Sequence, residues 1–455
     1  MSRHFHIATM GCQMNEYDSD HVAQLLQAED FKPTEDPRRA DLILINTCAV
    51  REKAEQKAYS LLGRMIGLKK KRRSRLLIGM MGCIAQQRGS SLLERFPGLD
   101  FVIGTKELET VPRVLENLTN RGGRIVAADL TKLSMFSQSN PDYFKDRIKS
   151  FVTIMEGCDN FCSYCIVPYV RGREVSRPPD EIIKEINELV EQGVKEVTLL
   201  GQNVNSYRSS EHQTKGFSFL LGKLNNVDGL LRIRFTTSHP KDLSDDLIHC
   251  FNDIEKVCPH IHLPLQSGSN HVLKSMRRGY TREHYLNLVE RLRRVSPDIA
   301  ITSDMIVGFP GETESDFDLT LDMVKRIGFD NIYSFKYSDR EGTLASTMER
   351  KVSLQERGER LQILQQFQKE ITLRKNQKLV GQEVEVLVEG KSKKGNELTG
   401  RTGSNKVVNF SFKSELLGNL VRVRIKNAYA NSLKGELIHG FSISSTGVLD
   451  GKWEN

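Results

Sequence analysis

The sequence lacks the long apolar runs that place a chain in a membrane. The longest uninterrupted aliphatic run near its beginning covers only residues 42–45, whereas a membrane-spanning helix needs about 20 apolar residues. The opening residues, MSRHFHIATMGC, contain no apolar core of a secretory signal. We therefore expect a cytoplasmic protein without a membrane partner, in a compartment where thiols stay reduced.

Strong bias of composition is also missing. Of the 455 residues, 38% are hydrophobic and 27% are charged, which is typical of globular domains and excludes the collagen-like and disordered classes. The 66 basic and 58 acidic side chains leave a net charge of only +8. At roughly 150 residues for each domain, the length predicts about three domains.

A disulfide framework is excluded as well, although the chain has eight cysteines. In a reducing compartment, cysteines act as metal ligands or nucleophiles, or pack as small buried hydrophobic residues. Their spacing along the chain separates these roles. The cysteines occupy positions 12, 48, 83, 158, 162, 165, 250 and 258.

Residues 1–118 alternate between strand-like and helical patterns, which predicts a parallel sheet covered by helices. The first three strand candidates end in Cys12, Cys48 and Cys83. Because ligands bind at the carboxyl ends of strands in open α/β sheets, these three thiols are predicted to share one ligand-binding edge. The strand candidates are residues 4–12, 41–48, 75–83 and 101–104.

Residues 119–148 are rich in polar and turn-forming residues, so we expect a linker. A second domain over 149–374 alternates six strand candidates with helical patterns, and a helix is expected at 353–375. This repeat predicts a (β/α)6 barrel or partial barrel with its chemistry at the carboxyl ends of the strands. The strand candidates are residues 151–158, 196–203, 231–240, 260–269, 300–312 and 331–339.

The last part, 376–442, changes to short alternating segments with glycine and asparagine turns, which predicts a small antiparallel β-barrel. Residues 376–437 contain 11 basic and 6 acidic side chains, a net charge of +5. The predicted fold class is therefore α/β: an N-terminal parallel α/β domain, a central partial barrel and this terminal β-barrel.

Cys158, Cys162 and Cys165 form a C-x3-C-x2-C motif after the first barrel strand. Three thiolates at this spacing can hold an iron–sulfur cluster, and a four-iron cubane held by three cysteines keeps one iron open. An open metal position is typical of catalysis. A zinc loop that lacks one histidine is the alternative, and the position at a carboxyl strand end favours the cluster.

This motif and several longer strings resemble the radical S-adenosylmethionine (radical SAM) superfamily, and within it the methylthiotransferases that modify tRNA. The resemblance covers the whole chain and identifies the terminal barrel as similar to a TRAM domain. The strings are TMGCQMNEYDSD (9–20), NTCAVREKAEQK (46–57), GCIAQQ (82–87), GCDNFCSYCIVPYVRGREVSRP (157–178), LLGQNVNSY (199–207), FTTSHP (235–240), LPLQSGS (263–269), DMIVGFPGET (304–313) and GRTGSNKVVNF (400–410).

The resemblance implies two 4Fe–4S clusters and S-adenosylmethionine (SAM) as cofactors. The cluster on the Cys158 motif would bind SAM at its open iron and supply the electron that cleaves SAM to a 5′-deoxyadenosyl radical. Cys12, Cys48 and Cys83 would hold an auxiliary cluster. SAM would act both as radical source and as methyl donor, and a reducing electron donor is required.

By the same resemblance, the clusters carry the chemistry and no classical acid or base is expected. Contacts to SAM are expected at the carboxyl strand ends and beside the cluster, where turn-forming, helix-capping or packing roles are the alternatives. Cys250 and Cys258 are expected to be core or surface thiols. The candidates for contact with SAM are Gly201, Gln202, Asn203, Ser238, Gln266, Gly308 and Tyr164.

Three basic features indicate RNA as the partner, because basic patches attract phosphate. They are the terminal β-barrel, the run from Lys69 to Arg75, and Arg171 with Arg173 after the cluster loop. For the run from Lys69 to Arg75, a solvated helix end is the alternative. The aromatic candidates for stacking on bases, of which at least one is expected in the core, are Phe410, Phe412 and Tyr429.

The resemblance implies that a methylthio group replaces the hydrogen at C2 of N6-isopentenyladenosine, at position 37 of tRNA. The anticodon stem–loop would be the partner of a monomeric enzyme, with its target base extruded. Sister branches methylthiolate threonylcarbamoyladenosine in tRNA or an aspartate of a ribosomal protein. A non-catalytic iron–sulfur protein that binds RNA is the alternative of another class, and an open iron disfavours it.

Overall fold

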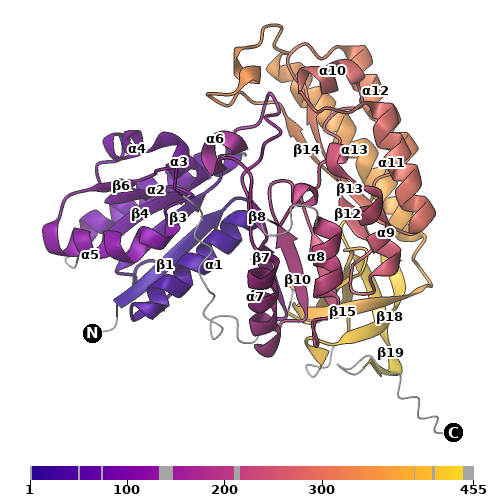
Figure 1. Cartoon of the computed structure of the whole chain (residues 1–455), viewed down its shortest axis with the longest axis horizontal. Helices are drawn as coiled ribbons and strands as arrows, with labels where there is room; N and C mark the ends of the chain where they lie inside the picture. Colours follow the sequence, from indigo (N-terminus) through magenta and orange to yellow (C-terminus); the bar gives the residue numbers. More distant parts are fainter. Residues whose placement is uncertain are drawn as a thin grey trace.

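The computed structural model describes residues 3–49, 52–72, 75–132, 147–209, 216–393, 395–411 and 416–443. Three regions follow one another along the chain: a six-stranded sheet, a pair of three-stranded sheets and a closed β-barrel (Figure 1). None of the helices within these ranges is both long and apolar enough to cross a lipid bilayer.

The first region confirms the predicted parallel sheet, with strand order β2-β1-β3-β4-β5-β6. Its central strand β3 is buried at every position, as expected for an apolar strand covered on both faces. Separate hydrophobic clusters lie on the two faces of the sheet. The elements are β1 (Arg3–Met10), α1 (Gln13–Ala28), β2 (Phe31–Pro33), β3 (Leu42–Thr47), α2 (Glu52–Lys71), β4 (Leu77–Gly82), α3 (Cys83–Arg88), α4 (Ser90–Arg95), β5 (Phe101–Ile103), α5 (Val111–Arg121) and β6 (Ile125–Ala127).

The structure differs from expectation at the end of this region. Strand β6 lies inside 119–148, the range predicted to be a linker, and pairs in parallel with β5. Strand β6 has only three residues and follows the Gly122-Gly123 turn, so it is too short to show an alternating strand pattern in the sequence. The sheet therefore has two strands more than the four predicted, β6 at this edge and the three-residue β2 at the other. Residues 133–146 of the predicted linker lie outside the described residues.

The second region is a partial barrel of six parallel strands, as predicted. The sheets β11-β10-β7 and β12-β13-β14 meet at one bridge between Ile233 and Val257. Within the described residues, β7 pairs only with β10 and β14 only with β13, so the barrel stays open between β7 and β14. The strands are β7 (Lys149–Thr153), β10 (Glu196–Leu200), β11 (Arg232–Phe235), β12 (His260–His262), β13 (Ala300–Val307) and β14 (Asn331–Lys336).

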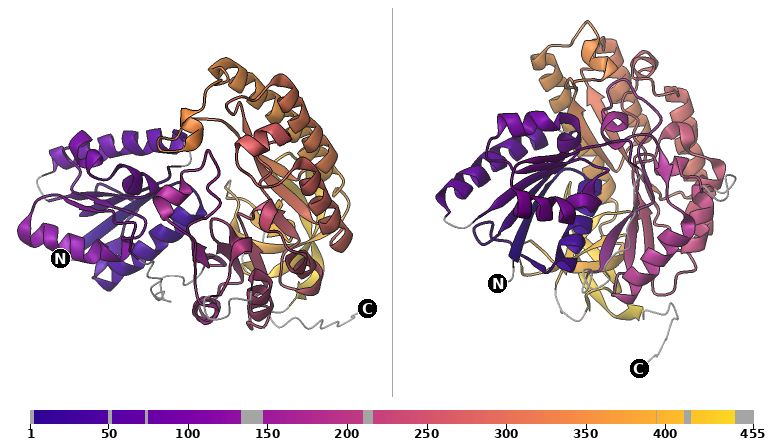
Figure 2. Two further views of the ribbon diagram at one scale, coloured as in Figure 1. Left: turned by 45° about the horizontal axis from the view of Figure 1, so that its top comes forward. Right: turned by 60° about the vertical axis from the view of Figure 1, so that its left-hand side comes forward.

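Helices follow these strands along the chain and bury the main hydrophobic core against them (Figure 2). A small antiparallel pair of strands and one short helix flank the cysteine loop. The elements are β8 (Met155–Glu156), α6 (Val167–Arg171), β9 (Val175–Ser176), α7 (Pro179–Glu191), α8 (Phe217–Leu224), α9 (Asp245–Asp253), α10 (Asn270–Ser275), α11 (Arg282–Val295), α12 (Glu314–Ile327) and α13 (Leu354–Gln377).

The terminal region is a closed barrel with strand order β15-β16-β17-β19-β18. Its strand pairs are antiparallel as predicted, except β17 and β19, which run in parallel. Apolar residues alternate along β18 and point into the barrel core. The strands are β15 (Glu383–Lys391), β16 (Leu398–Thr402), β17 (Val407–Phe410), β18 (Leu420–Ala428) and β19 (Leu433–Ile443).

The terminal barrel is attached to the amino-terminal side of the partial barrel. Arg232 and Arg234 on β11 donate hydrogen bonds to the main-chain carbonyl oxygens of residues 401–403, at 2.7–2.8 Å. Lys406 forms an ion pair with Asp330, just before β14, at 3.0 Å. The segment 400–410, which resembles an RNA-binding module, therefore turns part of its length toward the partial barrel.

Candidate active site

The fold brings the three N-terminal cysteines together. Strands β1, β3 and β4 are neighbours, and Met10, Thr47 and Gly82 lie in one register row across them. Cys48 and Cys83 directly follow that row, and Cys12 follows one residue later. Because neighbouring strands lie about 4.8 Å apart, the three backbones leave the sheet within about 10 Å of one another.

Close packing shapes this edge of the sheet. A Cβ atom added to Gly11 would lie 2.7 Å from the Cβ of Cys48, so only glycine fits beside that cysteine. The Asn15 side-chain oxygen accepts a hydrogen bond from the main-chain N–H of Cys12 at 3.2 Å and lies 3.4 Å from Cys12 Sγ. The Asn15 amide nitrogen donates to Asn46 on β3 at 3.0 Å. Asn15 thereby fixes the Cys12 turn to the neighbouring strand.

The three thiols of this group have unlike electrostatic surroundings. A hydrogen bond with Cys48, followed by Arg171 and nearby backbone N–H groups, lowers the pKa of Cys12 to about 5, although burial opposes the shift. Burial raises the pKa of Cys83, which Arg171 partly offsets. One member of the group is thus a thiolate at neutral pH, the form that ligates metal.

The second cysteine group lies in the loop between β8 and α6. The loop folds back on itself through a hydrogen bond from the Cys165 N–H to the Cys162 carbonyl, at 2.9 Å. The buried Arg278 guanidinium donates to Cys162 Sγ at 3.3 Å. Burial raises the pKa of Cys165 to about 12 and also raises that of Cys158. Binding of a metal cluster must therefore displace protons from this group.

The residues present fit iron–sulfur clusters by the chemistry of their donors. Each group supplies three cysteine thiols, the number that leaves one iron of a four-iron cubane open. An arginine guanidinium lies beside sulfur in each group, Arg171 in the first and Arg278 in the second.

The carboxyl ends of three neighbouring barrel strands hold unpaired polar atoms. Asn203 Oδ1, Ser238 Oγ and Gln266 Oε1 are buried and have no hydrogen-bond partner among the described residues. Gln266 also has a φ of +72°, a left-handed conformation that is strained for a residue with a side chain. Buried polar atoms are nearly always paired, and these three are free to accept hydrogen bonds from a bound molecule or from water. SAM, with amino and hydroxyl groups, could supply such donors.

The remaining predicted SAM residues have structural neighbours of their own. Gln202 Oε1 accepts a hydrogen bond from the N–H of Gly157, which ties β10 to the residue before Cys158. A Cβ atom added to Gly201 would lie 2.5 Å from the Met155 side chain. Tyr164 packs in an apolar cluster and accepts a 3.5 Å hydrogen bond from Arg278, so loop packing accounts for its position.

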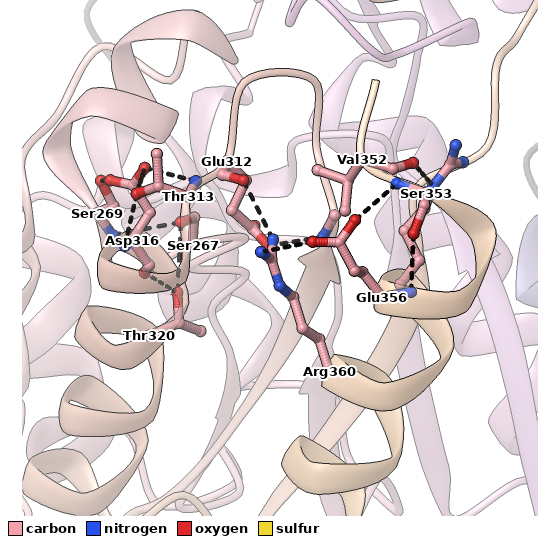
Figure 3. Close-up of polar contacts among 12 residues, drawn as sticks. Ser267, Ser269, Glu312, Thr313, Asp316, Thr320, Val352, Ser353, Glu356 and Arg360 are labelled. Carbon is pink, nitrogen blue, oxygen red and sulfur yellow. Dashed lines mark hydrogen bonds and ion pairs between the residues drawn. The ribbon is translucent and has the colours of Figure 1, made fainter. Parts of the chain in front are cut away.

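Gly308, the last SAM candidate, is fixed by a network at the end of β13. Its N–H donates to Glu312 Oε1 at 2.8 Å, and the same oxygen accepts from Arg360 on α13 at 2.8 Å. Figure 3 shows the Glu312 and Arg360 side chains of this network pointing toward each other. Burial raises the pKa of Glu312, an effect that these two donors oppose. Helix α13 starts with a capping box between Ser353 and Glu356, which places Arg360 two turns along the helix.

A buried charge network connects the two cysteine groups. Arg171 on α6 pairs with Asp18 on α1 at 2.5 Å, and it lies 3.8 Å from Glu156, two residues before Cys158. Lys106 completes the network at 3.2 Å from Glu156. The side chains of Arg171 and Asp18 are only 4% and 2% exposed. Sequence reasoning assigned Arg171 to RNA, and the structure places it at the interface between the domains instead.

Most other basic candidates for RNA contact are also engaged. In the run from Lys69 to Arg75, Lys69 pairs with Asp100 at 2.5 Å. Arg72 donates to the carbonyl oxygen of Ala40 and Arg75 to that of Leu118, while positions 73 and 74 lie outside the described residues. These ties hold α2 and β4 to the rest of their domain, while Lys70 and Lys71 are exposed in the last turn of α2.

The aromatic candidates and the two unassigned cysteines are placed as follows. Phe410 is buried in the terminal barrel, whereas Tyr429 is 54% exposed, and Phe412 lies outside the described residues. Arg173 is exposed and pairs with Asp159 at 2.8 Å. Cys250 and Cys258 are buried, and burial raises the pKa of each to about 11, which identifies them as core thiols.

Comparison with known proteins agrees with this architecture. Family models match three segments: "Radical SAM superfamily" at residues 152–324, "Uncharacterized protein family UPF0004" at 4–104 and "TRAM domain" at 377–438. Among solved structures, the radical SAM methyltransferase TsrM from Kitasatospora setae aligns with a TM-score of 0.55 at 15% identity, over 76% of this chain and 74% of that one. The fold and the cysteine loop thus define a radical SAM protein.

Two curated relatives show to which family of radical SAM proteins the chain belongs. The tRNA-2-methylthio-N(6)-dimethylallyladenosine synthase of Syntrophus aciditrophicus (strain SB) is 53% identical, covering 96% of this chain and 95% of its own length. The protein with the same name from Geobacter metallireducens (strain ATCC 53774 / DSM 7210 / GS-15) is 50% identical, over 95% of this chain and 98% of its own. The chain belongs to the family of tRNA-2-methylthio-N(6)-dimethylallyladenosine synthases.

Proposed function

We propose that this protein is a radical SAM methylthiotransferase that adds a methylthio group at C2 of N6-isopentenyladenosine, also called dimethylallyladenosine, in tRNA. Membership of the family supports the reaction, since the named relatives match across nearly the whole chain. The observation that carries the proposal is the arrangement of two cysteine groups, each at the carboxyl ends of strands and connected through Arg171.

The proposal assigns the cofactors to named residues. Cys158, Cys162 and Cys165 would hold one 4Fe–4S cluster, and the three N-terminal strand-end cysteines would hold the auxiliary one. With SAM bound, the first cluster supplies the electron that produces a radical able to take the hydrogen from C2. A hydrogen on an aromatic carbon is too weakly acidic for an ordinary general base, so radical chemistry suits this position.

The side chains of the barrel have two tasks in this proposal. Asn203, Ser238 and Gln266 direct their unpaired oxygens toward SAM and orient it, and Gly201 and Gly308 directly follow strands β10 and β13 of the same domain. Arg278 neutralises charge beside Cys162 from a fully buried position. Both tasks depend on a dry site, in which hydrogen bonds to charged groups are stronger than in water.

The proposal divides the chain into three working units and a linker. Residues 1–118 carry the auxiliary cluster, 149–374 carry the radical chemistry and 376–442 bind RNA, with 119–148 between the first two. The partner is the anticodon stem–loop of tRNA with position 37 extruded, and a separate reductant supplies electrons. The enzyme acts as a cytoplasmic monomer, which analytical ultracentrifugation of the reconstituted protein would test.

Mass spectrometry of nucleosides tests the reaction directly. In cells that lack the gene, tRNA should contain N6-isopentenyladenosine without its 2-methylthio form, and the wild-type gene should restore the modified nucleoside. Cys158→Ala should not restore it, while Cys250→Ala should, because Cys250 is a core thiol far from either group in sequence. Restoration of 2-methylthio-threonylcarbamoyladenosine, or of a methylthiolated ribosomal aspartate, would assign the protein to a sister branch.

A second measurement separates the enzyme from a non-catalytic iron–sulfur protein. Anaerobically reconstituted wild-type protein should cleave SAM to 5′-deoxyadenosine under reduction, and Cys158→Ala should not. Absence of 5′-deoxyadenosine from the loaded wild type would refute radical catalysis, even if the protein binds tRNA.

A further inference from the structure

A groove follows the free edge of the partial barrel. It has a volume of about 460 Å³ and lies between strand β14, helix α13 and the turn at Ala430 and Asn431 of the terminal barrel. Strand β14 is the last strand of its sheet and pairs on one side only within the described residues. The groove therefore joins the edge of the catalytic domain to the terminal barrel.

Strand β14, which lines the groove, connects features already described. Asp330 directly precedes this strand and pairs with Lys406 of the terminal barrel. At the other end of the strand, Lys336 lies opposite Val307 in the sheet, and Val307 directly precedes Gly308. A chain that lies along β14 would extend from the terminal barrel toward the carboxyl strand ends, where the candidate SAM residues are located.

Exposed aromatic rings gather at this groove. Across the described ranges only four aromatic side chains are classed as exposed, and three of them lie in the groove or next to it. Tyr333 and Phe335, both on β14, are 49% and 36% exposed and line the groove. Tyr429, 54% exposed, directly precedes the Ala430–Asn431 turn, and its carbonyl oxygen accepts a hydrogen bond from Asn376 at the end of α13.

The other lining residues suit a nucleic acid. Lys369 is the one charged side chain that lines the groove, and no acidic side chain does so among the described residues. Amide side chains of Asn331, Gln365 and Asn431 offer donors and acceptors for base edges. The Gln368 side chain also lines the groove, and its buried Oε1 has no hydrogen-bond partner in the described part of the chain.

We infer that this groove binds unpaired nucleotides of the RNA loop, with bases stacked on Tyr333 and Tyr429. Aromatic platforms interleaved with positive charge are the usual means of holding single-stranded nucleic acid. A peptide strand added to the edge of β14 would be the rival occupant, but such an occupant gains affinity from main-chain bonds and needs neither amides nor exposed rings. The inference rests on the proposed function, since it takes tRNA as the substrate.

Binding of a labelled anticodon stem–loop to the full-length reconstituted protein tests the inference. Tyr333→Ala should raise the Kd about fivefold to 150-fold, because loss of one base–aromatic stack has that size. Tyr333→Phe keeps the ring and should stay within about twofold of wild type. Lys369→Ala should weaken binding and lower its salt dependence, whereas Lys223→Ala, on α8 away from the groove, should do neither.

Photocrosslinking provides a readout that does not depend on any variant. A stem–loop with 4-thiouridine in the loop should crosslink wild-type protein at residues 331–336 or 429–431. Crosslinks confined to other segments, or a Tyr333→Ala/Tyr429→Ala variant that is folded by circular dichroism and binds with the wild-type Kd, would overturn the inference. Failure of the wild type itself to bind the stem–loop would instead remove tRNA as the substrate, and with it the proposed function.

Discussion

The two cysteine groups reach similar ends by opposite routes. Cys158, Cys162 and Cys165 lie within eight residues, so a single loop brings them together. The N-terminal cysteines are 36 and 35 residues apart in sequence, and only the register of three parallel strands aligns them. The first site can survive distortion of the surrounding fold, whereas the second exists only when the sheet is formed.

The two groups also differ in their readiness for metal. The pKa of Cys12 is lowered to about 5, which makes it a thiolate at neutral pH, whereas that of Cys165 is raised to about 12. Each group nevertheless has a buried arginine: Arg171 beside the N-terminal group and Arg278 beside the loop group. The thiols of the loop group must therefore lose their protons when the cluster binds. The strand-end group already contains one deprotonated thiol, that of Cys12, before the cluster binds.

The largest expected effect separates the tasks of the two groups. Cys158→Ala should abolish both SAM cleavage and methylthiolation. Cys12→Ala should abolish methylthiolation but leave reductive SAM cleavage largely intact, because the two clusters are held by different regions. Iron content after reconstitution should fall to about half in each variant. Loss of SAM cleavage in Cys12→Ala to the level of Cys158→Ala would show that the groups do not act separately.

The next effect concerns thiol reactivity in metal-free protein. Since the thiolate is the reactive form, Cys12 should be alkylated by iodoacetamide at pH 7 at least about a hundredfold faster than Cys165. The rate at Cys12 should be nearly constant above pH 6 and fall as the pH drops through about 5, where the thiolate gains its proton. Peptide mass spectrometry measures both sites in one sample. Equal rates at pH 7 would remove the electrostatic difference between the groups.

A smaller effect is expected from the charge network between the groups. Arg171→Ala leaves Asp18 buried without its partner, which should lower the free energy of unfolding by about 3 kcal/mol. Arg173→Ala removes an exposed pair and should cost less than about 1 kcal/mol. Urea denaturation of the metal-free proteins compares the two variants. Equal stabilities would mean that Arg171 does not hold the domains together.

The smallest effect is on the redox properties of the loop cluster. Arg278→Gln removes a positive donor beside Cys162, so the reduced, more negative cluster loses stabilisation and its reduction potential should become more negative. Redox titration followed by electron paramagnetic resonance measures the shift. The auxiliary cluster in the same sample serves as the control, because Arg278 lies beside the loop group. If the reduction potential of the loop cluster did not change, Arg278 would have only a packing role.

The sequence predicted the features that depend on short-range patterns. Strand–cysteine junctions at Cys48 and Cys83 are visible because apolar runs end there, and strand parallelism then places the thiols together. The structure alone revealed features that depend on long-range partners. Arg171 looks like any basic residue until Asp18, more than 150 positions earlier, is found beside it. Lys69 is a second example, because its partner Asp100 lies 31 positions later in the chain, directly before β5.

The terminal barrel shows the same limit of sequence reasoning. A string that resembles an RNA-binding module suggested that its residues contact RNA, yet residues 401–403 contact β11 through their carbonyl oxygens. Tyr429 carried no stronger signal than Phe410, and only burial separates the exposed ring from the core ring. Which face of a small barrel is free depends on where it docks, and that information lies in the other domain.

The docking of the terminal barrel through main-chain carbonyl oxygens has a consequence for how the family can diversify. Every residue type offers the same carbonyl group, so the guanidinium groups of Arg232 and Arg234 keep their partners whichever side chains occupy 401–403. Substitutions in that loop are therefore expected to leave the angle between the domains unchanged. The outer surface of the barrel can therefore change during evolution to suit a different RNA, while the distance from that surface to the reaction centre stays the same.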